Sequence, residues 1–124
     1  MELEPATAPG RQLVESYGGG RFRVSGSVYT GSVIVLPDRT LAWSVADFDG
    51  VRAETLTPVL AAPDLDLLLL GCGARMRLAT ASLRAPVRAA GIALEAMDTG
   101  AACRTFNVLT AEGRRVAAAL IAVD

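Results

Sequence analysis

The stretch LDLLLLG, residues Leu65–Gly71, is apolar at nearly every position and ends at Gly71-Cys72-Gly73. A strand that is covered on both faces shows a continuous apolar run of this kind, whereas a half-buried strand alternates. A second apolar segment, IALEAM at Ile92–Met97, follows within the roughly thirty residues that a strand-helix-strand unit occupies. These two segments predict neighbouring parallel strands joined by a right-handed crossover helix.

The residues between these two strands carry the signals of that helix. Thr80 or Ser82 is suited to cap its start, and the helix is expected to run to Ala90. Gly91 supplies the left-handed residue that commonly follows a helix. Pro86 conflicts with an interior helical position, where proline costs about 3 kcal/mol, so we expect the helix to start late.

A second helix and a final strand follow. In MDTGAACRTFNVL, Met97–Leu109, either Asp98 or Thr99 can cap a helix that ends at Gly113. RRVAAALIAV then predicts the last strand. Four residues of the helix have the spacing of one buried face: Ala102, Thr105, Phe106 and Leu109.

The first half of the chain predicts β structure. Residues 1–12 contain two prolines and no periodicity, so we expect a disordered lead before one α/β domain at 13–124. YGGGRFRVSGSVYTGSVIVLP predicts three short strands joined by glycine-containing turns. Leu41, Trp43 and Val45 alternate as in a fourth strand. The following DFDG lacks the ligands of a calcium loop and is interpreted as a turn, and Thr57-Pro58 predicts one helical turn.

Composition excludes several classes of chemistry. The 124 residues contain no histidine, and all twelve cations are arginine. A histidine-dependent nucleophile, an imidazole zinc site, a lysine Schiff base and a Walker lysine are therefore excluded. Two cysteines cannot alone form a structural zinc site, and no cofactor or metal is expected. The net charge of -1 argues against nucleic-acid binding.

The segment composition favours a cytoplasmic protein that does not insert into a membrane. Residues 1–10 carry two glutamates and no cation, which differs from export and transit signals. The apolar run at 116–123 is shorter than the roughly 20 residues that span a bilayer. Both cysteines are therefore expected as reduced thiols.

Four blocks of the sequence resemble a family known as a domain of unknown function. They are YGGGRFRVSG, GSVIVLP, LLLLGCGARMR and the long block GIALEAMDTGAACRTFNVLTAEGRRVAAALI. The family includes the mitochondrial assembly factor 3 of respiratory complex I and an adipogenesis-associated protein. The resemblance covers about residues 11–124 and implies no established reaction, cofactor or catalytic residue.

The resemblance also implies the fold. We expect a three-layer α/β domain with a central mixed five-stranded sheet whose last strand is antiparallel, plus a small N-terminal β element. In two places this chain departs from the family pattern. It has Gly71-Cys72-Gly73 where the family usually has Gly-Thr-Gly, and Thr105-Phe106-Asn107 where the family has Thr-Tyr-Asn. A reaction that needed either hydroxyl would be lost here.

The turn after the first strand is one candidate surface. Gly71, Cys72 and Gly73 would let a backbone approach an anion, with Arg75 and Arg77 to balance its charge. A dinucleotide fingerprint requires a third glycine where Met76 stands, so a structural turn is favoured over an anion or ligand contact.

The start of the last helix is the other candidate surface. Arg104 beside Cys103 would lower the pKa of the thiol, whereas Asp98 would raise it. A core cysteine is favoured, and a redox pair with Cys72 stays as an alternative. Asn107 lies one turn after Cys103 and either orients a ligand or holds neighbouring backbone.

Two functions remain open. The first is a non-enzymatic protein-interaction or assembly module that uses Gly71–Arg77 and Asp98–Asn107 to bind an unidentified protein partner, or a second copy in a homodimer. Converging arginines would then contact an acidic partner, and the candidates are Arg75, Arg77, Arg84, Arg88 and Arg104. The alternative is a small-ligand-binding or thiol-redox enzyme with a pocket at the carboxyl edge of the sheet.

Overall fold

The computed structural model describes residues 11–124, which form two sheets and three α-helices. The small antiparallel sheet contains β1 (Val14–Gly18), β2 (Arg21–Val24) and β3 (Ser27–Thr30). The larger sheet has the order β5-β4-β8-β6-β7, with β4 at Val33–Val35, β5 at Thr40–Ala42, β6 at Leu67–Gly71, β7 at Ala93–Met97 and β8 at Val116–Leu120. The helices are α1 (Thr57–Leu60), α2 (Ala81–Ala89) and α3 (Thr99–Ala111), and two short 3-10 helices lie at η1 (Phe48–Gly50) and η2 (Ala53–Leu56).

The larger sheet is mixed, as expected, but its opposing strand is β4 and not the last strand. β8 runs parallel to β6, which is also parallel to β7. β4 pairs antiparallel with both β8 and β5. The reason lies in the connections, because α3 carries the chain from β7 back to the start of β8 and so keeps these strands parallel. The expected antiparallel last strand is therefore wrong, whereas the five-stranded mixed sheet is confirmed.

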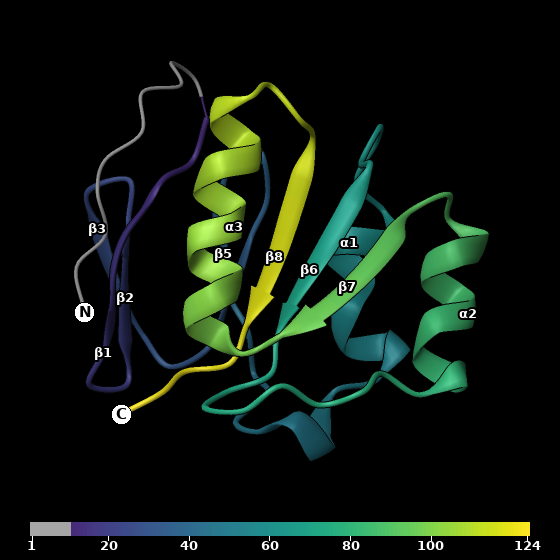
Figure 1. The fold of residues 1–124 in the computed structure, drawn as a ribbon, viewed down its shortest axis with the longest axis horizontal. Helices are drawn as coiled ribbons and strands as arrows, with labels where there is room; N and C mark the ends of the chain where they lie inside the picture. The colour runs from purple at the N-terminus through teal and green to yellow at the C-terminus, as the bar shows by residue number, and fades with distance from the viewer. Residues whose placement is uncertain (1–10) are drawn as a thin grey trace.

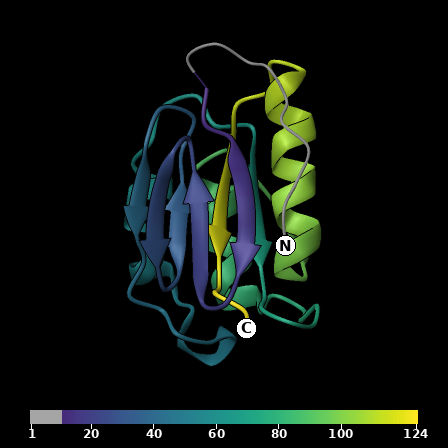
Figure 2. The same cartoon turned by 90° about the vertical axis from the view of Figure 1, so that its left-hand side faces the viewer.

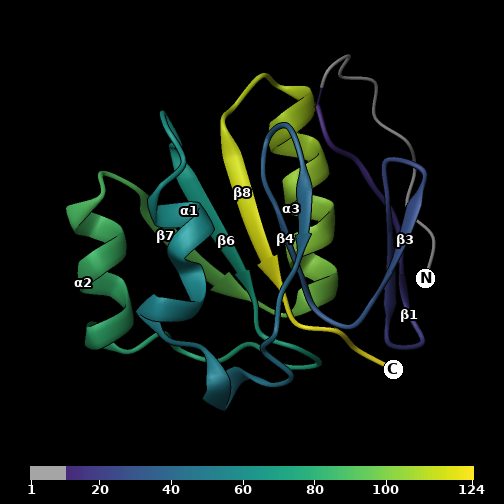
Figure 3. The same ribbon diagram turned by 180° about the vertical axis from the view of Figure 1, so that it is seen from behind.

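The sheet lies between two covering layers, which confirms the three-layer architecture. α3 lies in front of the sheet in Figure 1, and α1 lies in front of it in the reverse view of Figure 3. The small sheet stands beside α3 and is seen from its own side in Figure 2. Two buried apolar clusters fill the space on either side of the larger sheet.

β6 shows why the apolar run occurs. Leu67 and Leu69 pack with Phe106 of α3, while Leu68 and Leu70 pack in the opposite cluster with Val87 of α2. All five residues of the strand are buried. The continuous run is required because each face of the strand has its own core.

Several element predictions need correction. β1 was not expected, and residues 1–10 of the expected lead lie outside the described residues. The alternation at 41–45 gives a strand only at Thr40–Ala42, beyond which Trp43 is held by its ring N–H on the Thr55 carbonyl, 2.8 Å away. α2 begins at Ala81 with Pro86 inside it, so the expected late start is wrong. Leu83 and Val87 anchor the helix in the core and offset the hydrogen bond that the proline removes.

A glycine at the end of β6 limits how the layers fit. A Cβ at Gly71 would lie 3.0 Å from Leu120 Cδ2 and 3.1 Å from Thr99 Cα, and the second contact is backbone. We expect Gly71→Ala to lower the free energy of unfolding by about 1–3 kcal/mol, measured by urea denaturation, because this site is already filled. Gly50→Ala is the control, since the nearest atom to its Cβ would be 3.5 Å away. Equal losses for both variants would contradict the packing argument.

Candidate functional site

The candidate residues divide into a buried group and an exposed group. Five of them are buried, namely Gly71, Cys72, Gly73, Cys103 and Asn107. Asp98 is half-buried, and Arg75 and Arg104 are exposed. The cavities described within residues 11–124 are lined by other residues.

The glycine turn is bonded to the start of α3. The Gly73 N–H donates to Thr99 Oγ1 at 2.9 Å, and the Thr99 N–H donates back to the Gly73 carbonyl at 2.8 Å. The Thr99 hydroxyl then donates to the Ile121 carbonyl at 2.7 Å. Thr99, which sequence reasoning named only as an alternative cap, therefore joins the ends of β6 and β8 to α3.

Asn107 makes a second link of the same kind. Its Oδ1 accepts from the Val14 N–H at 2.9 Å, and its Nδ2 donates to the Val14 carbonyl at 2.8 Å. The amide therefore bonds to both backbone groups of Val14, as a paired strand would, and attaches β1 to α3. Both polar atoms are satisfied by backbone, so Asn107 orients this strand and not a ligand.

Asp98 and Cys103 complete the start of α3. Asp98 Oδ1 accepts from the Ala101 N–H at 2.9 Å, which confirms it as the cap. The buried face of the helix includes Ala102 and Phe106 as expected, but Cys103, Asn107 and Thr110 share it in place of Thr105 and Leu109, which are half-buried.

Burial disfavours the thiolate form of both cysteines. Burial raises the pKa of Cys103 to about 12, and Arg104 lowers it less than burial raises it. Burial also raises the pKa of Cys72, against the smaller opposite effect of backbone hydrogen bonds at Arg77 and Met97. Both cysteines are free thiols. Thiolate chemistry is therefore disfavoured at both positions.

The exposed part of the candidate site is the loop that follows Gly73. Met76 and Leu78 are exposed over 53% and 76% of their surface, and arginines alternate with them at Arg75 and Arg77. Arg77 pairs with Asp49 at 3.2 Å and lies 4.7 Å from the centre of the Phe48 ring. We call Ala74–Leu78 the loop surface.

Arg104 lies on α3 and contacts the small sheet. Its Nη1 donates to the Tyr17 hydroxyl at 3.3 Å. The Tyr17 ring in turn lies on Gly100, where a Cβ would come within 2.5 Å of the hydroxyl oxygen. Thr99, which precedes Gly100, bonds to Gly73 directly before the loop surface. We call this contact between the Gly73 turn and the start of α3 the junction.

The arginines do not converge as one patch. Arg84 and Arg88 lie on α2, on the face of the sheet opposite α3 and Arg104. They line a separate hollow beside β7. Of the five candidate arginines, Arg84 and Arg88 therefore do not share a face with Arg104.

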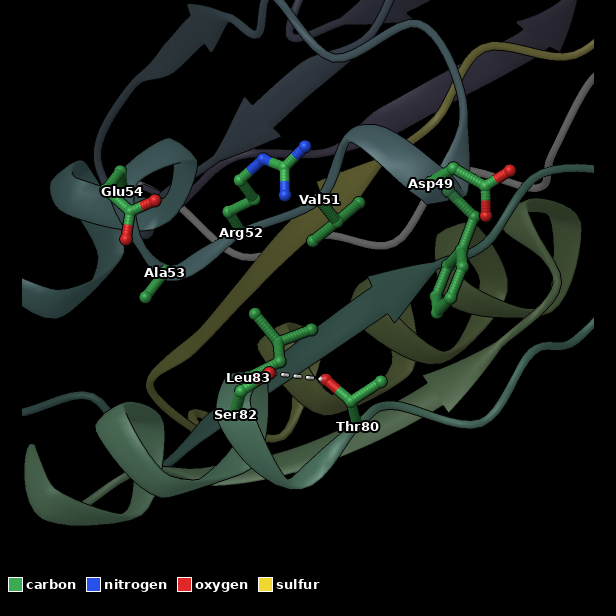
Figure 4. A pocket seen from close by; sticks show the side chains of 9 residues that line it. Asp49, Val51, Arg52, Ala53, Glu54, Thr80, Ser82 and Leu83 are labelled. Carbon is green, nitrogen blue, oxygen red and sulfur yellow. Dashed lines mark hydrogen bonds between the residues drawn. The ribbon is translucent and has the colours of Figure 1, made fainter.

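A cavity of about 420 Å³ lies between the segment η1–η2 and the start of α2. Figure 4 shows Thr80 and Ser82 on one side, their hydroxyl oxygens 3.0 Å apart, with Arg52 and Glu54 across from them. The sequence analysis missed this cavity because the cavity forms only when the DFDG turn at 47–50 and the residues after it fold against α2. Within residues 11–124, no group of three metal-ligating side chains is present.

The fold is a small three-layer α/β domain, in which the glycine turn and the start of α3 are bonded to each other. A family model described as a protein of unknown function, DUF498/DUF598, matches residues 14–121. The chain belongs to this family.

Relatives of this chain have been named in other organisms. It is 37% identical over 110 residues to NADH dehydrogenase (ubiquinone) 1 alpha subcomplex assembly factor 3 of Danio rerio, covering 88% of this chain and 63% of that protein. An uncharacterized protein of Rhodobacter capsulatus is 36% identical over 95% of this chain and 90% of its own length. The chain thus spans less than two thirds of the first of these relatives.

A solved structure has the same fold. The crystal structure of a Bartonella henselae protein, described as an outer membrane protein, has a TM-score of 0.86 at 36% identity and covers 94% of this chain and 98% of that one. Among residues 11–124 of this chain, none of the helices has the length and apolar character that spanning a bilayer demands.

The Asn107 link can be tested against a neighbour on the same helix. We expect Asn107→Leu to lower the free energy of unfolding by about 2–4 kcal/mol, because both backbone groups of Val14 lose their buried partner. Thr110 is the control, since its buried Oγ1 has no hydrogen-bond partner in the described part of the chain. Thr110→Val should leave stability unchanged or raise it, as measured by urea denaturation. A larger loss in the Thr110 variant would refute the assignment.

The buried thiol predicts a pH dependence. Because the folded pKa of Cys103 is raised from 9.0 to about 12, its contribution to stability is complete below pH 9.0 and is lost as the pH rises toward 12. At pH 8 we expect iodoacetamide to leave Cys103 unmodified in the folded chain and to modify it in urea, as read by mass spectrometry. Equal rates in both states would contradict this burial.

Proposed function

We propose that this chain is a non-enzymatic protein-interaction module of the assembly-factor type, and that it binds its partner through the loop surface. The single observation that carries the proposal is the exposure of Met76 and Leu78 on a segment whose base is fixed by buried hydrogen bonds. Exposed apolar side chains on a pre-ordered loop lose little conformational entropy on binding.

The charges beside these side chains suggest the chemistry of the partner. Arg75 and Arg104 have no carboxylate within ion-pair distance among residues 11–124, whereas Arg77 is paired with Asp49. An apolar patch bordered by acidic residues would complement this surface. Figure 1 shows the loop crossing below the carboxyl ends of β6 and β7, outside the sheet.

The family supports the same proposal. A relative that is 37% identical carries the name of an assembly factor, and Cys103 and Asn107 on α3 are buried in this chain. With it we propose a cytoplasmic location, in keeping with two free thiols in a reducing compartment.

The cavity in Figure 4 favours a second candidate function, which is small-ligand binding. Its volume of about 420 Å³ is within the range of ligand sites, and its walls carry two hydroxyls and both signs of charge. Neither cysteine lines it, so the thiol-redox form of this alternative has no support there.

The loop surface is tested by quantitative affinity capture with the whole chain as bait. We expect the double variant Met76→Ser/Leu78→Ser to lose about tenfold or more of the partner captured by the wild type, because the apolar contacts of the interface are removed. Val108→Ser is the matched control, since Val108 is also exposed, over 56% of its surface, but lies on α3. Unchanged capture by the double variant, or equal loss in the control, would rule out the loop surface.

A further inference from the structure

In the structure of residues 11–124, β7 is an edge of the larger sheet and pairs with β6 alone. The Ala93 N–H donates to the Asp66 carbonyl at 3.1 Å, and the Met97 carbonyl accepts from the Cys72 N–H at 2.8 Å. In a parallel strand the backbone groups alternate in direction, so those of Leu94 and Ala96 point away from β6. This edge therefore presents a short row of strand donors and acceptors.

A hollow of about 490 Å³ lies along this edge. It is lined by Arg84 and Arg88 of α2 and by residues 91–94. Figures 1 and 3 show α2 at the outer end of the molecule, next to β7 and beyond the rest of the sheet. α2 thus provides a wall for one face of a further strand.

Among residues 11–124, the two arginines of this wall have no charge partner. Arg84 Nη1 donates to the Leu94 carbonyl at a long 3.3 Å, and Arg88 is exposed. Their positive charge is thus available beside the outward backbone groups of β7.

The two faces of the edge differ in charge. Leu94 and Ala96 pack into the cluster on the α2 face, whereas Met97 packs on the α3 face. By alternation Glu95, which is exposed, belongs to the α3 face with Met97. An added strand would meet arginines on one face and a carboxylate on the other, so acidic side chains are favoured on its α2 face alone.

We propose that the β7 edge binds an extended acidic segment of a partner protein as an additional strand, with alternate carboxylates of that segment on Arg84 and Arg88. Backbone hydrogen bonds to Leu94 and Ala96 give this contact its affinity, once Arg84 has exchanged the Leu94 carbonyl for a carboxylate of the segment. The two arginines then select the acidic pattern. The β7 edge shares no residue with the loop surface, so this proposal and the proposed function are tested independently.

A second copy of this chain fits the edge poorly. An antiparallel pair of β7 strands would place the two α2 helices side by side on one face of the joined sheet. The arginines of one copy would then face those of the other, and β7 has no carboxylate on that face to compensate. Charge therefore favours a different, acidic partner.

To test this, a displayed library of short random peptide segments is selected for binding to the immobilised wild-type chain. Segments with acidic residues at alternate positions should be enriched, and a labelled synthetic copy of the best one should bind in fluorescence anisotropy. The double variant Arg84→Gln/Arg88→Gln should bind it about tenfold more weakly, as two partly exposed charge pairs predict. Arg21→Gln/Arg23→Gln, an equal charge change at two exposed positions of β2, should not.

Two further readings separate strand pairing from simple attraction. N-methylation of alternate amides in the segment should abolish binding, and hydrogen exchange at the Leu94 and Ala96 amides should slow when the segment is bound. Failure to enrich acidic alternation, equal weakening in both double variants, or unchanged exchange would overturn the proposal. If the free chain self-associates and the segment breaks up this association, the edge binds a second copy. That result would also overturn the proposal.

Discussion

The hydroxyl of Thr99 is the interaction on which the geometry of this domain depends. It accepts from Gly73 and donates to Ile121, so one buried oxygen holds the residues that follow β6 and β8. Both hydrogen-bonding directions are used, and the residue is fully buried, so loss of the hydroxyl would leave an unpaired donor and an unpaired acceptor. Since Thr99 is also the first residue of α3, the same contact fixes where that helix starts.

α3 extends this order to the rest of its layer. Its cap is Asp98, its apolar face fills one of the two cores, and Asn107 joins β1 through both backbone groups of Val14. Asp98 and Asn107, which the sequence offered as part of a candidate site, therefore make hydrogen bonds that hold the fold together. What they leave for function is the ordered surface around them, where Met76, Leu78 and the arginines face solvent.

Local patterns predicted the elements whose cause is local. The apolar run of β6 reports two covered faces, Asp98 caps α3, and Gly91 and Gly113 adopt the positive φ angles of +80° and +82° that end helices. β1 escaped prediction because its attachment depends on Asn107, 93 positions away from Val14. For the candidate site, the sequence favoured a core position for Cys103, and the structure buries this residue. It left open whether Asn107 orients a ligand or holds neighbouring backbone, because its partner Val14 is 93 positions away. The exposure of Leu78 likewise depends on packing between distant segments.

The place of β4 in the larger sheet has a consequence for biosynthesis. β4 lies between β5 and β8, and its pairing with β8 joins Val33–Val35 to a strand that is synthesised much later, Val116–Leu120. Until β8 is available, the β4–β5 hairpin has an unpaired inner edge made of valine and isoleucine, which is prone to association with other nascent chains. The larger sheet can therefore close only after β8 has been synthesised.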